Sequence, residues 1–145
     1  MLLFGYSYKC YYLKECIRVK KKINISESEW YIMNVLWDNE GLELKEITNK
    51  LMDNTNWKSA TIRTMLLRLI NKGFVKADTS TGVYKYFAII DKENCVKEEA
   101  KSFLDRIYKG SISQFISSFA KSGDISEKEK NEILEIISSM EDNND

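Results

Sequence analysis

The chain has 145 residues with 22 basic and 22 acidic side chains, no histidine and no proline. This length suits one ordinary domain, or a small domain with an added helical element. The lack of histidine excludes any mechanism that uses imidazole as a base or metal ligand.

The three cysteines show no metal-site spacing, and no apolar run approaches the roughly 20 residues of a membrane span. The apolar start precedes the basic cluster, which is the reverse of a secretory signal. We therefore expect a reduced, cytoplasmic protein without cofactor, metal or membrane insertion.

Residues 1–22 are rich in tyrosine and carry six Lys or Arg against one Glu, without a helical or strand period. We interpret them as a loosely ordered N-terminal extension. Two alternatives stay open: an arm that follows DNA phosphates or touches a membrane, or a translation start nearer Val19, which would remove the segment.

Two helices are predicted next. Ser26 to Glu29 forms an S-x-x-E capping box, typical of a helix start, and this helix should run to about Asn39, before Glu40 and Gly41. Apolar residues at helical spacing predict a second helix over residues 44–52, and the polar stretch 53–56 reads as a turn.

A third helix should begin at Ser59, or one residue earlier at Lys58, and end before Gly73. Its predicted core face holds Ile62, Met65, Leu66, Leu69 and Ile70. The opposite face holds Ala60, Thr61, Thr64, Leu67, Arg68 and Asn71. No carboxylate lies between Trp57 and Ala77, as suits a helix in a DNA major groove. A solvated face of an ordinary amphipathic helix is the alternative.

The period then changes to that of strands over residues 74–78 and 83–89, with turn residues at 79–82. A hairpin after a helix-turn-helix is the wing of a winged helix. Residues 57–90 hold six basic side chains against Asp78 alone, so a neutral protein presents a locally basic surface. The predicted base-reading residues are Thr61, Arg63, Thr64 and Arg68. The predicted phosphate contacts are Lys58, Lys72, Lys76 and Lys85.

Three more helices are predicted over residues 91–141, interrupted at Gly110 and restarted by a second capping box at Ser126 to Glu129. Their apolar stripes need a partner, and a two-fold homodimer buries identical stripes against each other. The predicted interface comprises Val96, Phe103, Leu104, Ile107, Tyr108, Ile112, Phe115, Ile116, Phe119, Ile133, Leu134 and Ile137.

These elements predict a mostly α fold with a small β wing. A winged helix-turn-helix DNA-binding domain over residues 23–90 is followed by a three-helix dimerisation region over 91–141 and a tail at 142–145. No nucleophile and base stand in a catalytic pattern, so we expect a binding protein and not an enzyme.

Several stretches follow one known pattern in order and spacing: Ile25-Ser26-Glu27-Ser28-Glu29-Trp30, Val35-Leu36-Trp37, Thr61-Ile62-Arg63-Thr64 with Arg68-Leu69, Lys72-Gly73-Phe74, and Ala100-Lys101-Ser102-Phe103-Leu104 with Tyr108-Lys109-Gly110. Over residues 23–140 the chain resembles the penicillinase repressor family of the BlaI and MecI type. It departs from the family pattern at Ala60, often lysine there, at Leu67, commonly threonine, and at Ser102, more often asparagine.

The resemblance implies a dimeric winged-helix repressor that binds palindromic operators with TACA/TGTA half-sites upstream of β-lactam resistance genes. It also implies a membrane sensor protease as a partner, which cuts the repressor in the first dimerisation helix. The bond that matches the family's cleavage site is Ser102–Phe103.

Two other functions stay open. The winged helix can be a protein-interaction module, in which case no DNA sequence is preferred. A thiol-responsive DNA-binding regulator is the other, with Cys95 or the pair Cys10 and Cys16 as the sensor.

Overall fold

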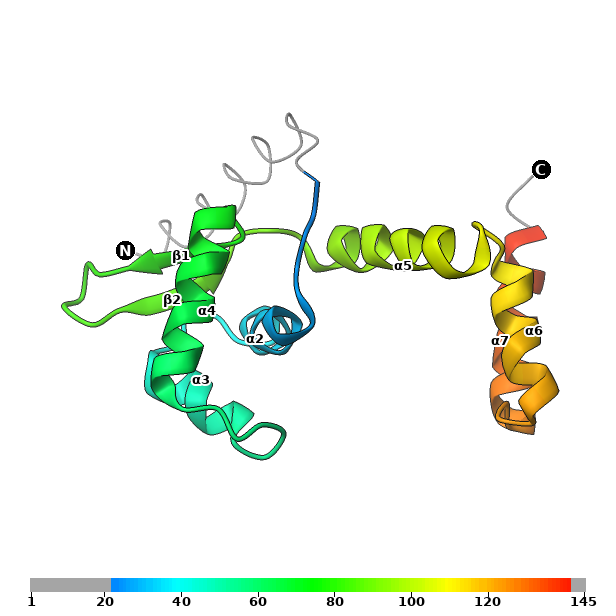
Figure 1. The fold of residues 1–145 in the computed structure, drawn as a ribbon, viewed down its shortest axis with the longest axis horizontal. Coiled ribbons are helices and arrows are strands. Elements are labelled where there is room, and N and C mark those ends of the chain that lie inside the picture. The colour runs from blue at the N-terminus through cyan, green and yellow to red at the C-terminus, as the bar shows by residue number, and fades with distance from the viewer. Residues whose placement is uncertain (1–21, 142–145) are drawn as a thin grey trace. The chain divides into compact units, whose positions relative to one another are not determined.

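Figure 1 shows the computed structural model, which describes residues 22–141. The predicted extension up to residue 21, with Cys10 and Cys16, and the tail at 142–145 lie outside the described residues. In chain order the elements are α2 (Glu27–Trp37), α3 (Leu44–Leu51), α4 (Ser59–Lys72), β1 (Val75–Asp78), β2 (Lys85–Ala88), α5 (Lys92–Tyr108), α6 (Ile112–Ser122) and α7 (Glu127–Glu141). The predicted mostly α fold with a small β wing is confirmed.

The chain divides between Glu98 and Glu99 into two compact units. We call the described residues 22–98 the N-terminal unit and 99–141 the C-terminal unit. This boundary lies inside α5, and the division into a DNA-binding domain over residues 23–90 and a dimerisation region over 91–141 stays a prediction.

The start of α2 is held by the predicted capping box. The Glu29 backbone N–H donates to Ser26 Oγ at 3.3 Å, and the Ser26 N–H donates to Glu29 Oε2 at 3.0 Å. The helix ends at Trp37, slightly before the predicted Asn39. Gly41 follows at φ +67°, a left-handed conformation that favours glycine, and an added Cβ would lie 2.6 Å from Phe87 Cζ of the wing.

Helix α4 has the predicted boundaries, with Lys58 as its N-cap and Gly73 in the left-handed region at φ 77°. Four of its five predicted core residues are buried, and the fifth, Ile70, is partly buried and packs against the same core. Apolar residues on one side of α4 thus fix which side faces outward.

The wing is an antiparallel pair in which Val75 lies opposite Ala88 and Asp78 opposite Lys85. Leu42 adds an isolated bridge to Tyr86, with N–H···O distances of 3.2 and 2.8 Å. The second strand is shorter than predicted. Val83 and Tyr84 precede it and are exposed.

The buried side chains form one core in the N-terminal unit, and that core includes Cys95 of α5. The start of α5 is also tied to α2, because Trp37 Nε1 donates to the Ile90 carbonyl at 2.9 Å and Lys92 pairs with Asp38 at 3.3 Å. These contacts explain why the unit boundary falls inside α5.

The C-terminal unit lacks such a core. No side chain described between residues 99 and 140 is buried. The unit contains an aromatic cluster of Phe103, Tyr108, Phe115 and Phe119, whose successive ring centroids lie 5.2 to 6.1 Å apart. The second capping box, between Ser126 and Glu129 at the start of α7, is present as predicted.

Candidate nucleic-acid interface

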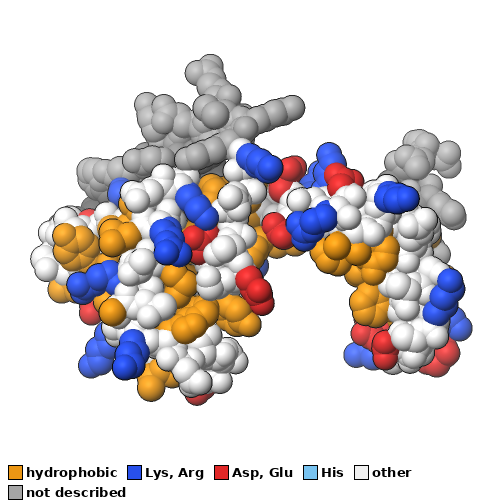
Figure 2. All heavy atoms as spheres, in the orientation of Figure 1, with side chains coloured by type: hydrophobic (Ala, Val, Ile, Leu, Met, Phe, Trp, Pro, Cys, Tyr) orange, Lys and Arg blue, Asp and Glu red, His pale blue; other side chains and the backbone are white. Residues whose placement is uncertain are grey.

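The outward face of α4 is the candidate reading surface. Thr61, Arg63, Thr64, Leu67 and Arg68 are all exposed along it. Figure 2 shows Lys and Arg side chains on the viewed face of the N-terminal unit. The arrangement presents hydroxyls and guanidinium groups without a carboxylate on the same helix.

The positions around the helix can be worked out from a turn of about 100° per residue. Ala60, Thr64 and Leu67 fall within an arc of about 60°, directly opposite the buried face. Arg63 and Arg68 lie on either side of that arc. The Thr64 hydroxyl donates to the Ala60 carbonyl at 3.0 Å, so its proton is used within the helix.

The wing brings Lys76 and Lys85 onto its two paired strands. Asp78 is the sole carboxylate between residues 57 and 90. Hydrogen bonds from Ser80, followed by the charges of Lys76 and Lys85, hold the pKa of Asp78 below its usual value. The wing therefore keeps one negative charge beside its two lysines at neutral pH.

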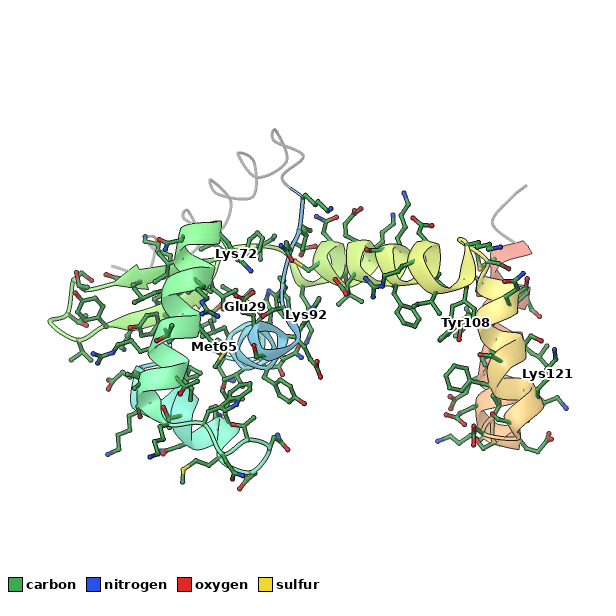
Figure 3. The ribbon with its side chains drawn as sticks, viewed as in Figure 1. Glu29, Met65, Lys72, Lys92, Tyr108 and Lys121 are labelled. Atoms are coloured by element: carbon green, nitrogen blue, oxygen red, sulfur yellow. The ribbon has the colours of Figure 1, made fainter. Side chains whose placement is uncertain are left out.

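Lys72 differs from the other predicted phosphate contacts. Its Nζ lies 2.7 Å from Glu29 Oε2 and donates to the Asn24 carbonyl at 2.9 Å, as the labelled pair in Figure 3 illustrates. The ammonium of Lys72 thus ties the end of α4 to the start of α2.

Glu29 is itself only 2% exposed. Burial opposes its ionisation, but hydrogen bonds from Lys72 and Ser26 outweigh burial and hold the pKa of Glu29 below its usual value. Sequence reasoning recognised Glu29 as a capping residue but missed its pairing with Lys72, because a separation of 43 residues leaves no periodic signal.

The predicted cleavage bond lies within the regular helix α5. Ser102 is exposed, whereas Phe103 is partly buried in the aromatic cluster, with its ring 6.0 Å from Tyr108 and 6.1 Å from Phe115. The residue before the bond is therefore at the surface, and the residue after it is packed in the cluster.

Cys95 is fully buried in the N-terminal unit. Burial, with a smaller contribution from the charge of Asp91, raises the pKa of its thiol to about 11. A protonated thiol without solvent access reacts poorly, so the structure speaks against Cys95 as a redox sensor.

The predicted dimer residues divide between the two units. Val96 belongs to the N-terminal unit and is exposed, and the others belong to the C-terminal unit. The large apolar side chains most exposed in the C-terminal unit are Ile107, Ile112, Phe119, Leu134, Ile136, Ile137 and Met140.

Within residues 22–141, no set of three or more potential metal ligands gathers in one place. Over the same range, every helix is too short or too polar to cross a bilayer.

Comparison with known proteins identifies relatives over most of the chain. The family model described as penicillinase repressor matches residues 25–139. A penicillinase repressor from Bacillus licheniformis is 32% identical over 119 residues, which is 82% of this chain and 93% of the relative. The methicillin resistance regulatory protein MecI of Mammaliicoccus sciuri is 26% identical over 117 residues, which is 81% of this chain and 95% of that protein.

Among solved structures, the DNA-binding domain of the repressor BlaI is similar at 34% identity and a TM-score of 0.46, over 52% of this chain and 93% of that domain. The family match extends from Ile25, just before the capping box of α2, to Ser139 within α7. The chain therefore belongs to the penicillinase repressor family, whose members are DNA-binding regulators and not enzymes.

Proposed function

We propose that this protein is a dimeric transcriptional repressor that controls β-lactam resistance genes from a palindromic operator, and that cleavage within α5 ends repression. The observation that carries the proposal is the acid-free outward face of α4 in a winged-helix unit. The relatives are named as a penicillinase repressor and a methicillin resistance regulator, which supports the choice of target genes.

In this proposal α4 lies in the major groove. Thr61, Arg63, Thr64 and Arg68 contact base edges and the adjoining backbone, while Lys58, Lys76 and Lys85 contact phosphates. Lys72 is assigned to holding α4 in place, because its ammonium is already bonded to Glu29 and to the Asn24 carbonyl.

The C-terminal units of two chains pair in the proposed dimer. Their exposed apolar side chains gain burial only against a partner, at about 25 cal/mol per Å². Two linked winged-helix units then bind both half-sites, which raises avidity by about 10²–10⁴ over a single unit.

The proposed switch is hydrolysis of the Ser102–Phe103 peptide bond by a membrane sensor protease. A protease binds its substrate extended, so this part of α5 must open locally before the cut. Cleavage separates the winged helix from the dimerisation helices, and occupancy of the operator is lost because each half-site contact becomes a separate binding event.

The proposal is tested with the full-length chain on DNA from its own promoter region. Gel shift and footprinting should give a symmetric protected site, and sedimentation should give a dimer at the concentrations used. A shift independent of DNA sequence would favour the protein-interaction alternative, and a monomer on a single half-site would contradict the dimeric part.

A further inference from the structure

We propose that Leu67 is a specificity-determining residue that reads the 5-methyl group of thymine. The inference deepens the proposed function and rests on it, since α4 must lie in the major groove. The ligand is thus a half-site in which a thymine faces the middle of α4.

Leu67 lies on the side of α4 that faces away from the core. The core side of α4 is centred on Leu69, with Ile62, Met65 and Leu66 around it. At about 100° per residue, Leu67 lies within about 20–30° of the direction opposite this centre. Asn71 lies at a similar angle but in the last turn, so Leu67 is the outward side chain nearest the middle of the helix's length, and it is apolar.

Leu67 is 56% exposed and is the sole large apolar side chain so exposed on α4. Single exposed leucines are ordinary on protein surfaces. This one is distinguished by its place between Arg63 and Arg68, which lie on the two flanks of the outward arc.

The chemistry around Leu67 suits a methyl group of the DNA. Ala60 and Thr64 lie on the same arc as Leu67, and the Thr64 hydroxyl proton is bonded to the Ala60 carbonyl. The arc around Leu67 thus offers methyl groups and few hydrogen-bond donors, and the amide of Asn71 follows one turn later at the end of α4. In the major groove, the base-pair feature that matches an apolar side chain is the thymine methyl, because the other edges present donors and acceptors.

The experiment replaces thymine by deoxyuridine, which lacks the methyl group and keeps the same hydrogen-bonding edge. Each thymine of a footprinted half-site is replaced in turn, and the Kd of the full chain is measured by gel shift. The wild-type chain should bind about fourfold more weakly at one or two positions, as expected for one buried methyl-sized group.

Leu67→Ala should bind thymine and deoxyuridine equally at those same positions. Met52→Ala is the matched control, because Met52 is 64% exposed but follows α3 and lies off the outward face of α4. It should keep the wild-type ratio. Circular dichroism on each variant shows whether the fold is retained.

Two results would overturn the inference: a wild-type chain that binds its operator but ignores every deoxyuridine, or a Leu67→Ala variant that keeps the wild-type ratio. Either leaves the repressor proposal standing. A chain with no sequence-dependent binding would overturn both proposals together.

Discussion

The two units of this chain use apolar residues in opposite ways. The N-terminal unit buries 15 hydrophobic side chains in one core, whereas the described C-terminal unit buries none and exposes several large ones. Both begin helices with capping boxes and both show apolar stripes. Helical periodicity therefore predicts where a helix forms. Whether its apolar stripe is buried within one chain depends on how many other elements pack against it.

The comparison has a thermodynamic side. A unit with its own core unfolds with a free energy independent of protein concentration. A unit whose apolar faces need a partner gains stability by mass action, so its stability should rise with concentration.

The largest expected effect comes from placing a charge on the exposed apolar face. Ile137→Asp should convert the proposed dimer to a monomer, because an ionised carboxylate is costly to bury. Operator affinity should then fall by about 10²–10⁴. Sedimentation and gel shift measure the two effects.

Asn131→Asp, also on exposed α7, adds the same charge to a polar position and should leave both quantities unchanged. An Ile137→Asp variant that stays dimeric would show that this face is not the interface.

The next effect sharpens the contrast between units. Leu66→Ala should lower the free energy of unfolding of the N-terminal unit by about 2–5 kcal/mol, since a fully buried side chain leaves a cavity. Denaturant unfolding at several protein concentrations should give the same loss each time. The exposed residue Met52 provides the control, with Met52→Ala expected within about 0.5 kcal/mol of wild type. A loss that varies with concentration would contradict the independence of this core.

A smaller effect concerns the reading face. Arg68→Ala should weaken operator binding by about 1–3 kcal/mol and random DNA much less, because a base contact carries sequence information and a phosphate contact does not. Arg106→Ala removes an exposed arginine of the C-terminal unit and should change neither. Equal losses on operator and random DNA would assign Arg68 to the backbone.

The smallest effect concerns the Lys72–Glu29 pair. Glu29→Gln should reduce stability by about 1–2 kcal/mol near neutral pH, with the exposure of Lys72 limiting the effect. Because the pKa of Glu29 is lowered in the fold, its contribution is present above the unfolded pKa of about 4.3 and is lost as pH falls through the folded value. Thermal unfolding of the wild-type chain and of Glu29→Gln is measured between about pH 2 and pH 7. The difference in stability between them should vanish in acid.

The salt dependence of DNA binding shows whether Lys72 contacts a phosphate or only holds α4 in place. Lys72→Met should leave the salt dependence of binding unchanged, whereas Lys76→Met should reduce its slope by about 1. A reduced slope for Lys72→Met would restore Lys72 as a phosphate contact.

Local rules predicted much of the fold. Both capping boxes, the left-handed Gly73 and the two faces of α4 are consequences of short-range chemistry, and the structure has them where the sequence places them. The division of the structure inside α5 could not be predicted, because the apolar stripe of α5 does not reveal that Cys95 packs in the core of the N-terminal unit.

The candidate site was predicted less completely. The exposed threonines and arginines of α4 follow from periodicity alone. The engagement of Lys72 does not, since it depends on tertiary packing that brings Glu29 and Asn24 to the end of α4. Val83 and Tyr84 have strand-like side chains but lie outside β2, where the turn separates the paired strands.

Cys95 is the last core residue in chain order, and its position has a consequence for how repression would be restored. Every side chain of the core lies on the N-terminal side of the Ser102–Phe103 bond. A cut there would leave a folded fragment that still occupies half-sites weakly and competes with newly made repressor. In the proposed mechanism, recovery of repression would then depend on dilution or degradation of that fragment as well as on fresh synthesis.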